Sequence, residues 1–139
     1  MIKFTAIAAF AAISLSAPAF AGDAAAGEKI FGKCKTCHAI VGDDGTAIQK
    51  GGKVGPNLYG VIGRPIASYP DFKYGDGILA AGALGLVWDE AMLAAYVVDP
   101  GKWLQENSGD PKAKSKMAFK LAKGGEDVAA YLASVKPAP

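Results

Sequence analysis

Cysteine and histidine are scarce in this chain of 139 residues, which contains two cysteines and a single histidine. All three lie within five consecutive positions, as Cys34-Lys35-Thr36-Cys37-His38. A structural zinc site needs four ligands, which typically come from two such pairs. Because the whole chain offers only three Cys and His side chains, a zinc-binding domain is not expected.

A strong excess of one charge is also missing. The chain carries 15 Lys and Arg side chains against 13 Asp and Glu side chains. Domains that bind nucleic acid usually carry a clear basic excess. The near balance of charges therefore indicates that nucleic acid is not a partner.

A hydrophobic run long enough to span a membrane is absent as well. The apolar run at residues 4–15 has about a dozen residues, whereas a transmembrane helix needs roughly 20. Lys3 precedes this run, and an A-x-A sequence follows it and ends at Ala21, which is the layout of a secretory signal peptide. We expect cleavage after Ala21, which leaves residues 22–139 as one domain in an oxidising compartment. A retained N-terminal anchor is the alternative.

Internal repeats and polar–apolar alternation are lacking, so the sequence predicts helices rather than strands. Helices are predicted at residues 24–35, between Asp89 and Pro100, and over "GGEDVAAYLASVK", which ends before Pro137. Gly27 lies inside the first of these helices, where glycine costs up to ~1 kcal/mol relative to alanine. A close contact between the first and last helices would explain this glycine.

The rest of the chain is expected to be mostly loop. Residues 42–63 contain seven glycines and one proline, and "GKWLQENSGDPKAKSKMAFKLAKGG" is expected to be a second long connector. So much irregular backbone is unusual in a compact domain of this size. The composition therefore predicts loops that wrap around a large bound group, which replaces part of the core.

The segment CKTCH then has two remaining interpretations. A thioredoxin-like CxxC lies at a strand-to-helix junction, whereas an amphipathic helix precedes Cys34. C-x-x-C-H is also the attachment site of c-type haem. Two thiols three positions apart can add to the two vinyl groups of one porphyrin, and the adjacent imidazole can bind the iron. A colourless dithiol oxidoreductase remains the alternative.

His38 supplies only one axial iron ligand, and the chain has no second histidine. Of the methionines after residue 21, Met92 lies in a predicted helix and Met117 in the loop "KAKSKMAFK". Met117 is far from His38 along the chain and can reach the opposite face of the ring. We predict Met117 as the second ligand. A haem protein with an open sixth position is the alternative.

Several segments in addition to CKTCH resemble class I cytochromes c, most closely the bacterial cytochrome c2 branch. They are "GDAAAGEKIFGKCKTCHAI", "VGPNLYGVIGR", "FKY", "KMAF" and "EDVAAYLASVK", in the order of that family. The resemblance implies an all-α domain in which the N- and C-terminal helices cross and loops wrap one covalently bound haem c.

The resemblance also implies roles for individual residues. Cys34 and Cys37 match the thioether cysteines, His38 the proximal ligand and Met117 the distal ligand. Pro56 matches the proline whose carbonyl accepts the hydrogen bond from the proximal imidazole.

Further matches concern the surroundings of the haem. Tyr96 matches a tyrosine near the methionine sulfur. Arg64, Tyr74 and Trp88 match donors to the haem propionates, and Ser115 occupies a position where the family often has a hydroxyl with a similar role. One departure is Ile78, where mitochondrial members place an amide side chain.

The implied function is one-electron transfer rather than enzyme catalysis, because an iron bound by both His38 and Met117 has no open site. The implied partners are a quinol-oxidising cytochrome bc complex as donor, and a photosynthetic reaction centre or a terminal oxidase as acceptor. The protein is expected to be a monomer.

Lysines are concentrated in two segments predicted to enclose the haem. Residues 29–42 and 111–125 contain lysines and no acidic side chain. We expect these lysines to form a docking surface for acidic partners, because long-range attraction speeds encounter while affinity stays weak. The residues expected at this surface are Lys33, Lys35, Lys112, Lys114, Lys116, Lys120 and Lys123.

Overall fold

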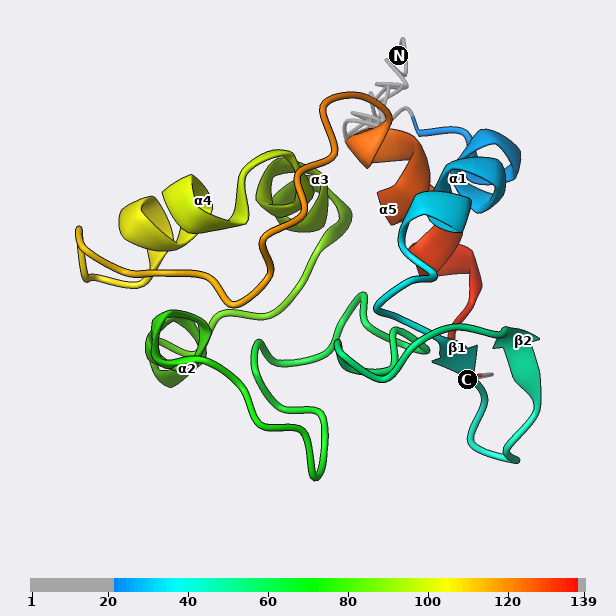
Figure 1. Cartoon of the computed structure of the whole chain (residues 1–139), viewed down its shortest axis with the longest axis horizontal. Helices are drawn as coiled ribbons and strands as arrows, with labels where there is room; N and C mark the ends of the chain where they lie inside the picture. Colours follow the sequence, from blue (N-terminus) through cyan, green and yellow to red (C-terminus); the bar gives the residue numbers. More distant parts are fainter. Residues whose placement is uncertain (1–21, 138–139) are drawn as a thin grey trace, which may run out of the picture.

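The computed structural model describes residues 22–137, so the predicted signal peptide at residues 1–21 lies outside the described part of the chain. The described residues form five α-helices, α1 (Ala24–Ile30), α2 (Asp76–Ala83), α3 (Glu90–Val98), α4 (Pro100–Asn107) and α5 (Gly125–Ser134). One turn of 3₁₀ helix, Phe31–Lys33, extends α1, and β1 (Ile40–Val41) pairs with β2 (Ala47–Gln49) in a short antiparallel hairpin. The all-α class predicted from the sequence is therefore confirmed (Figure 1).

Two of the predicted helices begin at side chains that cap them. Asp23 accepts hydrogen bonds from two amides in the first turn of α1, and Asp89 accepts one from the first turn of α3. Such caps satisfy amides that have no partner inside the helix. The predicted end of the first helix at Lys35 is wrong, because the α-helix ends at Ile30 and the 3₁₀ turn ends at Lys33.

The prediction of a single long connector after Pro100 is also wrong, since α4 occupies its first part. The Asp99 carboxylate accepts a hydrogen bond from the Lys102 amide at 3.1 Å, and Pro100 stands at the first turn of the helix. Proline is favoured there because its missing N–H has no helical partner in any case. The same residues that end α3 therefore begin α4.

Helices α1 and α5 lie side by side, as Figure 1 shows. Gly27 is buried at their contact, and a Cβ atom there would collide with the Asp127 carbonyl and come within 2.9 Å of the Tyr131 Cβ. The rings of Phe31 and Tyr131 pack 5.8 Å apart. The close approach predicted at Gly27 is thus confirmed.

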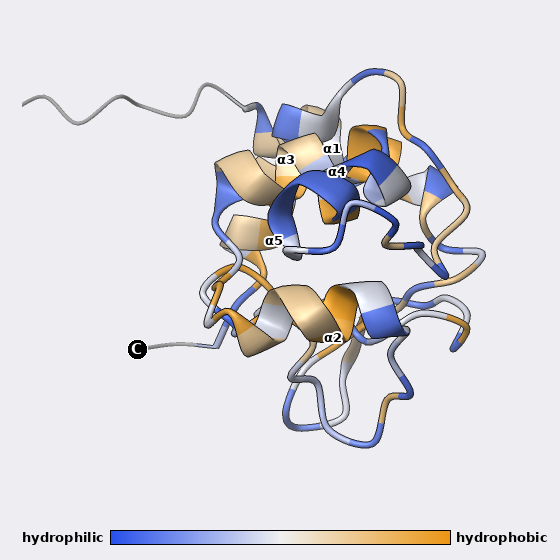
Figure 2. Cartoon of the chain, turned by 90° about the vertical axis from the view of Figure 1, so that its left-hand side faces the viewer, coloured by the Kyte–Doolittle hydropathy of each residue, from blue (hydrophilic) through white to orange (hydrophobic). Residues whose placement is uncertain are grey.

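The remaining elements are arranged around an internal space. Helix α2 packs against α4, and the segment that follows α4 runs back toward α5 (Figure 1). Figure 2 shows α2 on the other side of the molecule from α1 and α3. The largest fully buried side chains include Phe31, Leu104, Val128 and Leu132, and all four also line one cavity. Within residues 22–137, no helix is long and apolar enough to cross a membrane.

Candidate functional site

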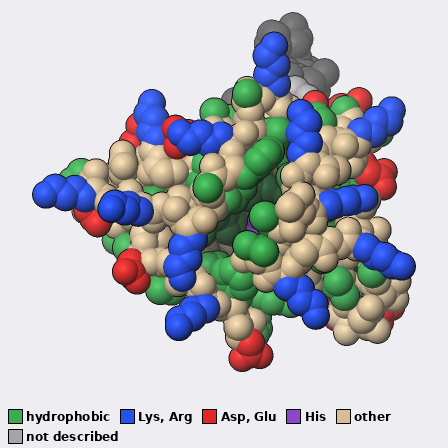
Figure 3. Space-filling view, viewed as in Figure 1, with side chains coloured by type: hydrophobic (Ala, Val, Ile, Leu, Met, Phe, Trp, Pro, Cys, Tyr) green, Lys and Arg blue, Asp and Glu red, His purple; other side chains and the backbone are tan. Residues whose placement is uncertain are grey.

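A cavity of about 910 Å³ opens to the surface between α2, α3 and the loops that follow α1. Figure 3 shows a hollow lined with hydrophobic side chains, with a histidine visible inside it. All ten residues predicted to hold the cofactor line this single cavity. They are Cys34, Cys37, His38, Pro56, Arg64, Tyr74, Trp88, Tyr96, Ser115 and Met117.

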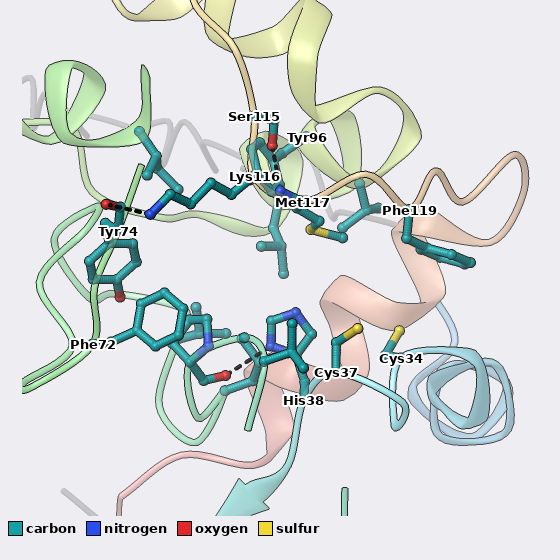
Figure 4. A pocket seen from close by; sticks show the side chains of 18 of the residues that line it. Cys34, Cys37, His38, Phe72, Tyr74, Tyr96, Ser115, Lys116, Met117 and Phe119 are labelled. Carbon is teal, nitrogen blue, oxygen red and sulfur yellow. Dashed lines mark hydrogen bonds between the residues drawn. The ribbon is translucent and has the colours of Figure 1, made fainter. Parts of the chain in front are cut away.

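The CKTCH segment forms a helical turn immediately after the 3₁₀ helix. The amides of Cys37 and His38 both donate to the Cys34 carbonyl, at 3.1 and 2.9 Å. This turn places both thiols and the imidazole on the cavity side (Figure 4). Both cysteines are free, and burial raises the pKa of the Cys34 thiol, with a smaller contribution from Cys37. The described residues contain no cluster of three Cys, His, Asp or Glu side chains that could hold a metal ion.

The glycine-rich loop packs directly against this turn. The Gly52 amide donates to the Lys35 carbonyl and the Gly55 amide to the Cys37 carbonyl, both at 2.8 Å. A Cβ atom at Gly55 would overlap the imidazole ring of His38. The glycines are therefore required because the loop backbone approaches the CKTCH backbone and the His38 ring so closely.

The orientation of His38 is fixed by a hydrogen bond from its Nδ1 to the Pro56 carbonyl at 2.8 Å. A carbonyl can only accept, so Nδ1 carries the proton. Burial lowers the pKa of His38, and the bond to Pro56 opposes this shift. The neutral ring then presents the Nε2 lone pair, which is the form that binds a metal.

Met117 lies across the cavity from His38, and the two cysteine sulfurs lie together at one side (Figure 4). The Met117 amide donates to the Ser115 hydroxyl at 3.1 Å. By contrast, Met92 lies in α3, packs against the core and does not line the cavity. The donors present, two thiols and one imidazole facing a thioether across an apolar cavity, fit a covalently attached haem with two axial ligands.

Aromatic side chains form one wall of the cavity. The ring centroids of Trp88 and Tyr96 lie 5.1 Å apart, in an edge-to-face arrangement. Burial raises the pKa of the Tyr96 hydroxyl, opposed by a hydrogen bond with the Ser115 side chain, so the hydroxyl stays protonated. Sequence reasoning missed Trp103, which supports both rings from behind at 5.4 and 5.6 Å.

Arg64 and Tyr74 add polar groups to the lining. Arg64 donates to the Asn57 carbonyl at 2.9 Å, and its guanidinium lies 5.1 Å from the centre of the Tyr69 ring. The Tyr74 hydroxyl accepts from the Tyr69 amide at 3.1 Å, which leaves its own proton free to donate. Ile78, at the position of the family's amide, also lines the cavity, so the contact there is apolar.

The predicted docking lysines are not equivalent in the structure. Lys33, Lys114 and Lys116 line the cavity, as does Lys73, which sequence reasoning missed. Lys35, Lys112 and Lys123 are exposed but do not line it. Figure 3 shows Lys and Arg side chains around the hollow.

Lys120, which was predicted as a docking lysine, is paired with an acidic side chain from outside its segment. Its Nζ lies 2.7 Å from the Asp99 carboxylate. Asp99 lies at the junction between α3 and α4. Asp99 lies 21 positions earlier, so its proximity could not be seen in the local sequence.

Comparison with known proteins gives close relatives over nearly the whole chain. Cytochrome c2 of Rhodobacter capsulatus is 66% identical over 128 residues, which cover 92% of this chain and 93% of that protein. Cytochrome c-550 of Paracoccus versutus is 56% identical over 140 residues, which cover 98% and 91%. No model of a protein family matches the chain.

Solved structures give the same result. The structure of cytochrome c2 from Rhodobacter capsulatus superposes with a TM-score of 0.81 at 66% identity, and the match covers 82% of this chain and 98% of that one. Ferric cytochrome c-550 from Paracoccus versutus superposes with a TM-score of 0.81 at 58% identity, covering 84% and 99%. The likeness therefore extends to both sequence and fold.

Proposed function

Because the chain belongs to the class I cytochromes c, in the cytochrome c2 branch, and so carries covalent haem c, we propose that it is a one-electron carrier. The haem supplies an iron that alternates between Fe(II) and Fe(III). The chain holds the group, orients it and sets the electrostatics around it.

Four residues would hold the haem directly. Cys34 and Cys37 would attach it through thioether bonds, and His38 Nε2 and Met117 Sδ would be the protein ligands of its iron. The hydrogen bond from His38 Nδ1 to Pro56 keeps the imidazole in one tautomer and one orientation. A methionine ligand and apolar surroundings both favour the less charged ferrous state, so the reduction potential is expected to be high.

The polar lining would bind the charged edge of the haem. Arg64, Tyr74 and Trp88 are proposed as donors to its propionates, and Tyr96 as a neighbour of the Met117 sulfur. The Ser115 hydroxyl, expected from the family to act on the propionates, accepts from the Met117 amide. Ser115 therefore has a second role, which is to orient the segment that bears Met117.

The single observation that carries the proposal is the placement of His38 and Met117 across one cavity (Figure 4). With both residues bound to the iron, no position remains for a substrate or for oxygen, so a carrier is favoured over an enzyme. The same ligands serve both oxidation states, which keeps structural change on electron transfer small.

The proposed setting is the periplasm, reached through cleavage after Ala21, with the protein acting as a monomer. A cytochrome bc complex would be the donor, and a photosynthetic reaction centre or terminal oxidase the acceptor. The lysines that line the cavity mouth support docking to an acidic surface.

The test compares two methionine substitutions in the holoprotein. Met117→Ala is expected to lower the reduction potential by a substantial part of the ~0.8 V range that axial ligands span. It is also expected to raise the affinity of the ferric protein for added imidazole by more than about tenfold. Met92→Leu, the matched control in α3, is expected to leave both values unchanged. If Met117→Ala kept the wild-type potential and imidazole affinity, the ligand assignment would be wrong.

A further inference from the structure

The segment that bears Met117 is held mainly by side chains. We name residues 114–120 the Met117 strap; they lie between the buried residues Ala113 and Leu121. The Ala113 amide donates to the Asp110 carbonyl at 3.0 Å and the Leu121 amide to the Val97 carbonyl at 2.8 Å. Within the described part of the chain, no backbone–backbone hydrogen bond involves the strap itself. Its position therefore depends on contacts made by its side chains.

One such contact joins the C-terminal end of the strap to the helices behind it. Lys120 Nζ donates to Asp99 Oδ2 at 2.7 Å. The other carboxylate oxygen, Oδ1, accepts from the Lys102 amide at the start of α4. The hydrogen bond to α4 therefore orients the Asp99 carboxylate independently of Lys120. The hydrogen bond from Lys120 is the largest cause that holds the pKa of Asp99 below its ordinary value, so the carboxylate is charged at neutral pH.

The strap makes two other polar side-chain contacts with distant segments. Ser115 forms a hydrogen bond with the Tyr96 hydroxyl of α3, and the contact made by Lys116 is looser. Lys116 Nζ lies 3.4 Å from the carbonyls of both Lys73 and Tyr74, on the opposite side of the cavity. These are long hydrogen bonds to neutral acceptors, whereas the Lys120 bond is short and joins two opposite charges. The Lys120–Asp99 pair is therefore stronger than the Lys116 contacts.

We propose that the Lys120–Asp99 pair is a positioning clamp that keeps Met117 in the cavity, and that Lys120 is not one of the docking lysines. This inference rests on the proposed role of Met117 as iron ligand. The clamp acts next to the Leu121–Val97 bond, so two adjacent attachments fix the strap three residues after Met117. Val97 also lines the cavity, so the Leu121–Val97 bond connects the strap to the cavity wall.

The experiment measures imidazole binding to the ferric holoprotein by its visible spectrum. Added imidazole must displace Met117, so its affinity rises as the protein holds Met117 less firmly. Asp99→Asn removes the charge but retains an effective helix cap for α4, and Lys120→Gln removes the other partner. Each is expected to raise the imidazole affinity about two- to fivefold, the range for one partly exposed ion pair. The double variant is expected to show no further increase, as a double-mutant cycle requires of one shared interaction.

A second ion pair provides the matched control. Lys102 and Glu106 lie 3.8 Å apart on α4, are at least as exposed and form no hydrogen bond or ion pair with the strap among the described residues. Glu106→Gln changes the net charge by the same amount as Asp99→Asn and is expected to leave the imidazole affinity unchanged. Equal effects of these two substitutions would overturn the clamp, as would wild-type affinity in both Asp99→Asn and Lys120→Gln.

The Met117→Ala variant separates failure of this inference from failure of the proposed function. If Met117→Ala binds imidazole much more tightly than wild type while Asp99→Asn does not differ, only the clamp is wrong. If Met117→Ala binds imidazole no better than wild type, the ligand assignment itself fails and the clamp fails with it.

Discussion

At the scale of single residues, the His38 ring is held between a hydrogen-bond acceptor and a residue without a side chain. Pro56 accepts from Nδ1 at 2.8 Å, and the neighbouring Gly55 leaves the space that the ring occupies. Both lie in the glycine-rich loop, so its backbone sets the direction of Nε2.

This arrangement predicts the effect of Gly55→Ala. The new Cβ atom would overlap three atoms of the His38 ring, so either the loop or the imidazole must move. Overpacking of this kind typically costs ~1–3 kcal/mol, and we expect the free energy of unfolding of the ferric holoprotein to fall by about that amount, measured in guanidinium chloride. Gly101→Ala is the control, because its Cβ atom would meet only the Asp99 carboxylate oxygen, at 3.7 Å. A loss for Gly55→Ala no larger than for the control would contradict this account of the loop.

Much of the site could be predicted from residue types. With one histidine in the chain, a His-ligated iron could only use His38, and the loop position of Met117 distinguished it from Met92. Phe72, Lys73 and Phe119 also line the cavity; they lie within the segments "FKY" and "KMAF", but no role was assigned to them. Their side chains face the cavity only because the chain folds back on itself. The pairing of Lys120 with Asp99 was missed for the same reason.

At the scale of elements, the apolar spacing predicted α1, α3 and α5, whereas α2, α4 and the hairpin were missed. Helix α2 has Gly75 at its N-cap, so no side chain caps it, and the helix itself contains two further glycines; its local sequence therefore gives little helical signal. The hairpin strands have only two and three residues, too few to show alternation. Helix α4 could have been found, because Asp99 followed by Pro100 is typical of a helix start.

The crossing of α1 and α5 predicts opposite effects for two neighbouring glycines. Gly27→Ala gains helix propensity of up to ~1 kcal/mol, but its Cβ atom collides with the Asp127 carbonyl of α5. We expect a net loss of ~1–3 kcal/mol in the free energy of unfolding. Gly32→Ala meets no atom within 4 Å and is expected to be neutral or stabilising. Thermal unfolding of both variants would check this, and equal melting temperatures would refute the close crossing.

At the scale of the whole molecule, the position of charges matters more than their sum. The formal net charge is only +2, yet four lysines line the cavity mouth (Figure 3). A local positive patch can steer an acidic partner even when the total charge is small.

This arrangement predicts a salt-dependent encounter with the proposed donor complex. We expect the second-order rate of electron transfer to fall steeply as ionic strength rises from ~0.01 M, where the screening length is ~30 Å. Lys114→Gln is expected to slow the reaction at low salt by a factor on the order of two to five, a small part of the 10–10³-fold range of electrostatic steering. Lys50→Gln, an exposed lysine after β2 that does not line the cavity, is expected to have a smaller effect. Stopped-flow kinetics would measure both, and a rate independent of salt would argue against docking through this face.

The cavity also explains why so small a domain has so much loop. Four of its largest fully buried side chains, Phe31, Leu104, Val128 and Leu132, line the cavity, so the bound group completes the core that they begin. The prediction that loops wrap a large bound group is met by a cavity of about 910 Å³ inside a domain of short helices.

The most direct test of the account is the visible absorption spectrum of the full chain produced in a host that matures c-type cytochromes. The spectrum is recorded on the oxidised protein and again after reduction. The account predicts sharp c-type bands in the reduced state and, in the oxidised state, the weak red band of a methionine sulfur bound to ferric iron. A haem spectrum without the red band would contradict the pairing of His38 with Met117 across the cavity. A colourless protein would contradict haem attachment at Cys34 and Cys37 altogether.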